Sequence, residues 1–210
     1  MPEPSTRLYL ILPAIADRAA FKPLLDSALD GSDVACVLLR QPGHDDIKAT
    51  AQALLSVVQA RDAAFLVEGD PRLAARIGAD GVHVGYSADA FESAVSSLGR
   101  EAIVGAGRLA TRDDAMSAGE AGASYVMFGE PDADGACPAP EHTLERVTWW
   151  ADIFTVPCVG YAGTLGEIGP LAEAGAEFVA LCDAVWKHPA GPANAIKEAQ
   201  TILAKAVMTA

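Results

Sequence analysis

The chain has 210 residues, 51% of them hydrophobic, and a formal net charge of −13 at pH 7. This length and apolar content predict one domain, residues 1–210, with a single sizeable core. The acidic excess would repel a phosphate backbone and argues against a nucleic-acid partner. No apolar run approaches the roughly 20 residues of a membrane span, and no basic-then-apolar segment opens the chain, so we expect a cytoplasmic protein without membrane contact.

Eight short apolar segments follow one another along the chain, separated by amphipathic stretches. We predict strands at 8–12, 34–39, 64–67, 81–84, 102–105, 125–128, 156–159 and 178–181. Helical periodicity is clearest at 45–61, 111–121, 141–154 and 192–207. Capping residues or an early proline support helix starts at Asp70-Pro71, Thr111 and Gly191-Pro192.

One helix-to-strand joint recurs in the sequence. It reads IGADGVHVG at 77–85, AGASYVMFG at 121–129 and AGAEFVALC at 174–182. In each copy a glycine suited to the left-handed helix cap precedes a small residue, a polar residue and an apolar strand. We therefore expect Gly78, Gly122 and Gly175 to follow helices, with positive φ. Their spacing of about two βα units, at roughly 20 to 30 residues per unit, is typical of a parallel β/α array.

Eight strand-then-helix units in this length predict an α/β fold, a compact single-domain (β/α)8 TIM barrel. The alternative is a doubly wound open sheet. No predicted strand is followed by GxGxxG, so a dinucleotide site has little support.

The order of motifs resembles a known family. The motifs are LYL at 8–10, VLLR at 37–40, GADGVHVG at 78–85, IVG at 103–105, SYVMFG at 124–129, VP at 156–157 and AGA at 174–176. Over nearly the whole chain they are similar to thiamine-phosphate synthase and its thiazole tautomerase relatives. The resemblance implies a transferase of thiamine biosynthesis that joins a pyrimidine diphosphate to a thiazole phosphate with Mg²⁺, or, as in the relatives, an isomerase of the thiazole carboxylate phosphate.

Several functional positions of that family are altered here. The family's Gln-x-Arg-x-Lys on the second strand reads LLRQP at 38–42, so Arg40 alone remains. Its two Mg²⁺-binding carboxylates fall on Gly69 and Ala88, with Asp70 and Asp89 each one residue late. Hard cations need correctly placed oxygens, so the Mg²⁺ that the resemblance implies is not expected to bind strongly, and no metal ligand is assigned.

Barrel chemistry lies in the loops after the strands, and these loops supply the candidate site residues. The catalytic candidates are Arg40 and Glu130. Glu130 stands where the tautomerase relatives carry a His, and it would serve as a general base if burial raised its pKa, as we expect. The candidate substrate-binding residues are Glu68, Tyr86, Gly107, Arg108, Tyr161, Gly163 and Asp183.

The charges of these candidates bear on the ligand. Asp183 falls in the family's phosphate corner and opposes a phosphate, although Gly163 and nearby amides could still hold one. Glu68, Glu130 and Asp183 should converge on the barrel mouth with Arg40 as the main opposing charge, which favours a cationic or proton-transfer ligand. His83, inside a strand, is expected to be a hydrogen-bonded core histidine.

Two classes of function stay open at this stage. One is a transferase of the thiamine-phosphate synthase type, or a tautomerase-like isomerase that uses Glu130. The other is a non-catalytic or repurposed barrel that binds a thiamine-related small molecule or a partner protein. A different phosphate-handling barrel enzyme, such as an epimerase, is a weaker third reading supported by architecture alone. A small-molecule ligand is expected for the enzyme readings, and a homo-oligomer is compatible with all of them.

Overall fold

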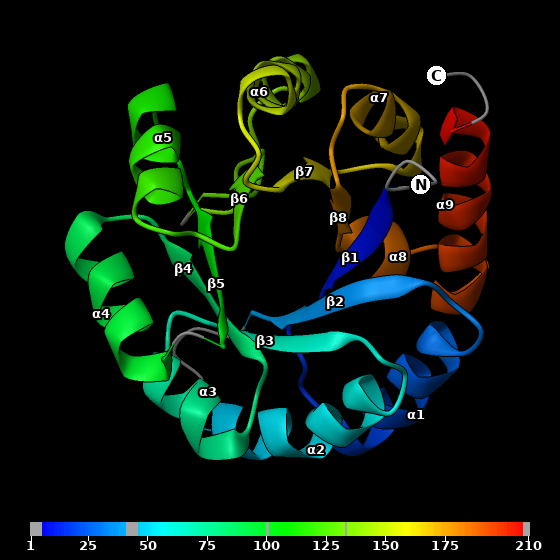
Figure 1. Ribbon diagram of the computed structural model, residues 1–210. Helices are drawn as coiled ribbons and strands as arrows, with labels where there is room; N and C mark the ends of the chain where they lie inside the picture. The colour runs from blue at the N-terminus through cyan, green and yellow to red at the C-terminus, as the bar shows by residue number, and fades with distance from the viewer. Residues whose placement is uncertain (1–5, 41–45, 100, 133, 208–210) are drawn as a thin grey trace.

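The computed structural model describes residues 6–40, 46–99, 101–132 and 134–207. Within them each strand pairs in parallel with the next, and β8 pairs with β1 to close a barrel (Figure 1). The strands are β1 (Arg7–Ile11), β2 (Val34–Leu39), β3 (Ala64–Glu68), β4 (Gly81–Gly85), β5 (Ile103–Gly107), β6 (Tyr125–Phe128), β7 (Cys158–Ala162) and β8 (Phe178–Leu181). The expected (β/α)8 barrel is confirmed, and the open-sheet alternative is wrong.

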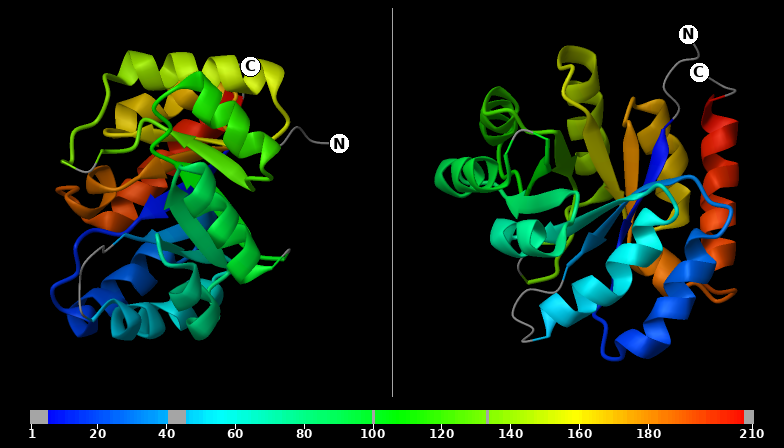
Figure 2. Two further views of the ribbon diagram at one scale, coloured as in Figure 1. Left: turned by 90° about the vertical axis from the view of Figure 1, so that its left-hand side faces the viewer. Right: turned by 60° about the horizontal axis from the view of Figure 1, so that its bottom comes forward.

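The helices form an outer layer around the strands, as two further views show (Figure 2). They are α1 (Arg18–Leu29), α2 (Ile47–Gln59), α3 (Pro71–Ile77), α4 (Ala88–Leu98), α5 (Arg112–Glu120), α6 (Pro140–Ile153), α7 (Ile168–Glu173), α8 (Asp183–Trp186) and α9 (Pro192–Val207), with a 3-10 turn at Leu165–Glu167. The four predicted helices are found within two residues at each end, residue 45 lying outside the described residues. Among the described helices, none is long and apolar enough to cross a bilayer.

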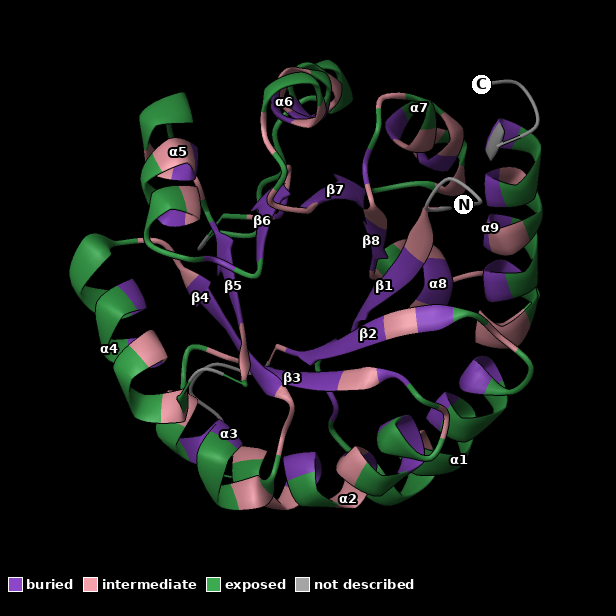
Figure 3. Ribbon diagram, viewed as in Figure 1, coloured by how far each residue is buried: buried purple, intermediate pink, exposed green. Residues whose placement is uncertain are grey.

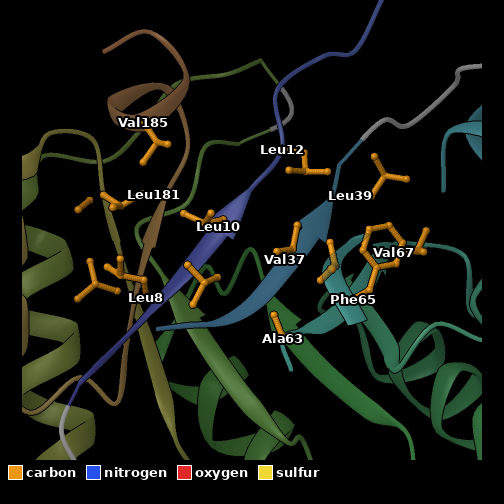
Figure 4. Close-up of a cluster of buried hydrophobic side chains, with 14 of the residues drawn as sticks. Leu8, Leu10, Leu12, Val37, Leu39, Ala63, Phe65, Val67, Leu181 and Val185 are labelled. Atoms are coloured by element: carbon orange, nitrogen blue, oxygen red, sulfur yellow. The ribbon is translucent and has the colours of Figure 1, made fainter. Parts of the chain in front are cut away.

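Side chains of the strands alternate between two cores. Those that point outward pack under the helices, as Leu8 and Leu10 of β1 and Leu12 just after it do beside Val37 and Leu39 (Figure 4). The inward side chains fill the barrel itself, and they are Tyr9, Ile11, Cys36, Leu38, Leu66, Tyr125, Met127, Val159, Tyr161 and Ala180. The buried faces of strands and helices in Figure 3 follow this arrangement. The interior of the barrel is thus a packed core of side chains.

The three glycine joints have the expected conformation. Gly78, Gly122 and Gly175 follow α3, α5 and α7 with φ of 75°, 92° and 93°. In the first joint, the Asp80 carboxylate accepts the backbone N–H of Phe65 at 2.8 Å and so ties the start of β4 to β3. A Cβ on Gly81 would overlap the backbone carbonyl of Ile103 in β5. The residues of this motif therefore set how three neighbouring strands meet.

Two strands run further than the sequence suggested. The predicted segments 102–105 and 156–159 are observed as Ile103–Gly107 and Cys158–Ala162. Glycines within these strands leave room for neighbours: a Cβ on Gly105 would overlap the ring of Tyr125, and a Cβ on Gly160 would meet Leu171 Cδ2 at 2.9 Å. These glycines lie within the strands and do not end them.

The contact at Gly81 gives a first prediction. Gly81→Ala should lower the free energy of unfolding by about 3 kcal/mol, since its methyl group must push β4 away from the backbone of β5. Gly166→Ala is the matched control, because a Cβ there would meet Thr164 Oγ1 at 3.8 Å, an ordinary contact. Denaturant unfolding at pH 7 measures both, and equal losses in the two variants would contradict this explanation of the motif.

Candidate active site

A cavity of about 840 Å³ opens at the carboxyl ends of the strands. Its walls combine apolar and charged residues from the ends of all eight strands or the loops that follow them. The described residues that line it are Ile11, Leu12, Pro13, Ala14, Arg40, Glu68, Gly69, Gly85, Arg108, Pro131, Asp132, Gly135, Tyr161, Cys182, Asp183 and Lys187. Of the sequence-predicted site residues, Arg40, Glu68, Arg108, Tyr161 and Asp183 are therefore brought together around one space.

Glu130 contacts two residues that line this cavity, Arg40 and Arg108, and 2% of its own side chain is exposed. Its Oε2 pairs with Arg40 Nη2. Its Oε1 accepts the backbone N–H of Arg108 and lies 3.3 Å from His83 Nε2. Both carboxylate oxygens are thus held by cationic or N–H groups from β2, β4 and the end of β5.

The pKa of Glu130 is lowered to about 2. Burial by itself raises it, but the attraction and hydrogen bonds of His83 and Arg40 outweigh the desolvation. The expected rise in the pKa of Glu130 is therefore wrong. Sequence reasoning took account of the burial of this side chain and missed its two partners, and the carboxylate is ionised at neutral pH.

His83 continues this cluster into the barrel. Its Nδ1 lies 2.8 Å from the hydroxyl of Tyr125, which in turn lies 2.8 Å from the hydroxyl of Tyr9. The ring of His83 stacks on that of Tyr125 with centroids 5.7 Å apart. Burial raises the pKa of both tyrosines well above their usual value. His83 is the hydrogen-bonded core histidine that its place in the strand predicted.

Glu68 joins the cluster to the cavity wall. Its Oε1 accepts a hydrogen bond from Arg108 Nη2 at 2.6 Å and lies 3.2 Å from Arg40 Nε. Only 6% of the Glu68 side chain is exposed, against 40% for Arg108. Arg108 also has a positive φ of 51°, which is uncommon for a residue with a Cβ. A strained backbone at a cavity wall is typical of a functional position.

The far side of the cavity carries a second pair of charges. Asp183, at the start of α8, pairs with Lys187 Nζ at 2.7 Å, one turn further along the chain. Gly163, after β7, is not at the cavity wall: its N–H donates to Glu167 Oε2 at 2.9 Å, and Thr164 Oγ1 donates to the other oxygen of that carboxylate. A carboxylate of the chain thus already accepts the hydrogen bond of the Gly163 amide, which the sequence offered as a possible phosphate contact.

The balance of charge at the mouth differs from the expected acidic excess. Among the described lining residues three cations face three carboxylates, namely Arg40, Arg108 and Lys187 against Glu68, Asp132 and Asp183. Lys187 was missed from the sequence, although its spacing of four residues from Asp183 on a helical segment was a usable signal. The cavity therefore does not favour a cationic ligand on charge alone.

Two other candidates lie away from the cavity. Tyr86 is half-buried against Phe91, with ring centroids 6.1 Å apart. Gly107 is buried at the end of β5, where a Cβ would overlap both Glu130 Oε1 and the imidazole of His83. Its role in the structure is to leave space for that pair, since its own backbone does not line the cavity.

The residues near the family's Mg²⁺ positions do not fit a metal. Asp70 Oδ1 accepts the N–H of Leu73 at 2.9 Å and caps α3. Asp89 is exposed in the first turn of α4. Within the described part of the chain, no group of three or more His, Cys, Asp or Glu side chains is placed to hold a metal ion.

Comparisons with known proteins agree with this architecture. The family model described as thiamine monophosphate synthase matches residues 8–185. A thiamine-phosphate synthase of Rhodospirillum centenum is 45% identical over 202 residues, which cover 94% of this chain and 97% of that protein. One from Hyphomonas neptunium is 38% identical over 93% of each chain. This chain belongs to the thiamine-phosphate synthase family.

A solved structure has the same fold as this chain. The thiamine phosphate pyrophosphorylase from Pyrococcus furiosus superposes with a TM-score of 0.76 over 95% of this chain and 96% of its own, at 21% identity. The motifs that carry the family resemblance in this chain include the joint at 78–81. In it, the Asp80 carboxylate accepts a hydrogen bond from the backbone of β3, and Gly81 leaves space for the backbone of β5.

The low pKa of Glu130 leads to a stability prediction. Because its pKa in the folded protein, about 2, lies below the usual 4.5, ionised Glu130 stabilises the fold at neutral pH. That contribution, on the order of 3 kcal/mol, should disappear as the pH falls from about 4.5 to about 2. Glu130→Gln should be less stable than the wild type at pH 7 and should lack this component of the pH dependence.

Denaturant unfolding at pH 7 and pH 3 measures this difference. Glu145→Gln is the control, since Glu145 forms an exposed pair with Arg112 at 2.9 Å, worth about 1 kcal/mol at most. Parallel pH curves for wild type and Glu130→Gln would show that the buried carboxylate does not contribute in this way.

The cap formed by Asp70 gives a prediction about metal. Asp70→Ala should lower the free energy of unfolding by about 1 kcal/mol, through loss of the α3 cap. Calorimetric titration of the ligand-free protein with Mg²⁺ should show no micromolar binding in either the variant or the wild type. Micromolar binding that is lost in Asp70→Ala would overturn this reading of Asp70.

Proposed function

We propose that this chain is a transferase of the thiamine-phosphate synthase type, which joins a pyrimidine diphosphate to a thiazole phosphate and releases diphosphate. The observation that carries the proposal is the 45% identity to a named thiamine-phosphate synthase over almost the full length of both chains. The cavity of about 840 Å³ supports it, since sites for small molecules usually measure about 300 to 1,000 Å³.

Arg108 and Lys187 are the cations best suited to hold the anionic groups of these substrates. Their side chains are 40% and 74% exposed at the cavity. Arg40 is mostly buried, and its charge is balanced by Glu68 and Glu130. We assign Arg40 and Glu130 to positioning this wall of the cavity, while Arg108 and Lys187 stabilise the negative charge that develops on the departing diphosphate.

A tautomerase-like isomerase that uses Glu130 as its base has less support. A general base near neutral pH needs a pKa near the working pH and a free lone pair within reach of the substrate. Glu130 has a pKa of about 2, and partners occupy both of its oxygens. The family resemblance implies Mg²⁺. By that resemblance, the two carboxylates that bind the metal fall on Gly69 and Ala88, which have no side-chain oxygen, so no step of the present proposal depends on it.

The proposal is tested by incubating the protein with pyrimidine diphosphate and thiazole phosphate, with and without Mg²⁺, and by measuring thiamine phosphate by chromatography. Arg108→Gln should lower kcat/KM by about 10- to 100-fold, the effect of losing charge-assisted hydrogen bonds to an anion. Arg72→Gln, an exposed change on α3, should leave kcat/KM unchanged.

The outcome also separates the remaining alternatives. Absence of product under all these conditions, together with binding of the substrates in calorimetry, would favour a non-catalytic thiamine-related binding protein. If Arg108→Gln forms product as fast as the wild type, the chain is still a transferase, but Arg108 does not bind the anionic groups of its substrates.

A further inference from the structure

A second cavity lies outside the barrel, between the amino-terminal ends of α5 and α6, which are neighbours in the outer layer (Figure 1). We call it the outer cavity. It measures about 620 Å³ and is lined by residues 109–112, by the end of β6 and by the first two turns of α6. Within the described part of the chain, no residue lines both this cavity and the one at the barrel mouth. Its size is that of a small-molecule site.

The outer cavity gathers positive charge on a chain whose formal net charge is −13. Two arginines line it, Arg112 and Arg146, against one carboxylate among its described lining residues, Glu145. The carboxylates in the first turn of α5, Asp113 and Asp114, are not part of its lining. A local excess of cations concentrates anions at one place on a protein that otherwise repels them.

Arg146 carries a charge without an acidic partner. Its Nη2 donates to the backbone carbonyl of Ala110 at 3.1 Å, and among the described residues it forms no ion pair. A guanidinium has five N–H donors in a fixed plane, and this arrangement matches the oxygens of a phosphate group. The contact with Ala110 uses one of these donors and holds the half-buried side chain at the cavity.

Arg112 is the second cation, and its acidic partner is easily displaced. Its Nη2 lies 2.9 Å from Glu145 Oε1, and the two side chains are 45% and 65% exposed, so their ion pair is weak. The guanidinium also lies over the ring of Trp149, with its central carbon 4.7 Å from the ring centroid. This cation–π contact keeps the Arg112 charge at the cavity when Glu145 turns away.

The rest of the lining offers an apolar surface beside these charges. Leu109, Phe128 and Pro138 line the cavity, and Phe128 belongs to the core under the helices. His142 also lines it, and an imidazole ring has at least one N–H donor in either protonation state. The cavity therefore suits a ligand that has an anionic group and an apolar part.

We infer that the outer cavity binds a small phosphorylated molecule with an aromatic or aliphatic part, at a site separate from that of the substrates. The phosphoryl oxygens accept hydrogen bonds from Arg112 and Arg146, and the apolar part lies against Leu109 and Phe128. This site goes beyond the proposed function and does not depend on it, since neither arginine lines the cavity at the barrel mouth.

Two of the three tryptophans report on the two cavities separately. Trp149 lies under Arg112, whereas Trp186 donates from its indole nitrogen to the carbonyl of Ile11, a residue of the barrel mouth, at 2.8 Å. Isotope-labelled protein is titrated with phenyl phosphate, and the indole N–H signals are followed by NMR. The Trp149 signal should shift and saturate at millimolar phenyl phosphate. Benzyl alcohol, which has the ring without the phosphoryl group, should bind there at least about tenfold more weakly.

Substitutions in the outer cavity should change this dissociation constant in opposite directions. Arg146→Gln should raise it at least about tenfold, through loss of charge-assisted hydrogen bonds, and Arg112→Gln should do the same. Glu145→Gln should lower it by about two- to fivefold, since it releases Arg112 from a weak exposed pair and removes a negative charge from the wall. A purely structural role of these residues gives no such opposite change.

Two controls keep the outer cavity intact. Arg76→Gln removes an exposed arginine on α3, and Lys187→Gln removes a cation of the barrel mouth. Both variants should keep the wild-type dissociation constant measured at Trp149.

Three results would overturn the inference. The first is a response to phenyl phosphate at Trp186 alone, or at neither indole. The second is a wild-type dissociation constant in folded Arg146→Gln and Arg112→Gln. The third is an equal weakening in Arg76→Gln, which would show attraction by overall charge and no defined site.

Discussion

The carboxylate of Glu130 is the interaction on which the site depends. It lies where the packed interior of the barrel ends, and it holds Arg40 from β2, His83 from β4 and the backbone of Arg108 after β5. A buried charge that loses its partner is strongly destabilising. Arg40 therefore keeps one position, and that position in turn fixes where Glu68 meets the cavity.

The same contact divides the cations of the mouth into two kinds. Arg40 is buried between two carboxylates and keeps the wall in shape. Arg108 and Lys187 have more exposed side chains. The partner of Lys187, Asp183, is exposed as well, whereas the carboxylate partner of Arg108, Glu68, is buried. Because exposed ion pairs are weak, an incoming anion can compete most easily for Lys187. On the function proposed above, the cations that bind an anion and the cation that shapes the wall are different residues.

The sequence was sufficient for the fold because its signals are local. Gly78, Gly122 and Gly175 end helices through their own backbone conformation, and apolar strands need no distant information to be recognised. The strand-end rule also selected Arg40, Glu68 and Glu130. Their pairing was beyond reach, because Glu130 meets partners 90 and 47 residues earlier in the chain.

Those distant partners also decide the sign of the electrostatic effect. The burial of Glu130 could be anticipated from the neighbouring Phe128, and burial alone raises the pKa of a carboxyl group. The attraction and hydrogen bonds of His83 and Arg40 lower the pKa of Glu130 instead. Lys187 is a different case, since its pairing with Asp183 is local and a four-residue spacing could have revealed it.

The joint at Gly78 to Gly81 has an evolutionary consequence. Asp80 and Gly81 hold β3, β4 and β5 together at the end of the barrel that carries the helix-to-strand joints, while the side chains that face the cavity come from the opposite strand ends. These strand contacts are therefore made at positions away from the cavity. A lineage can replace exposed residues of the cavity wall, such as Lys187, and keep these contacts, so descendants of one ancestor can come to accept different ligands.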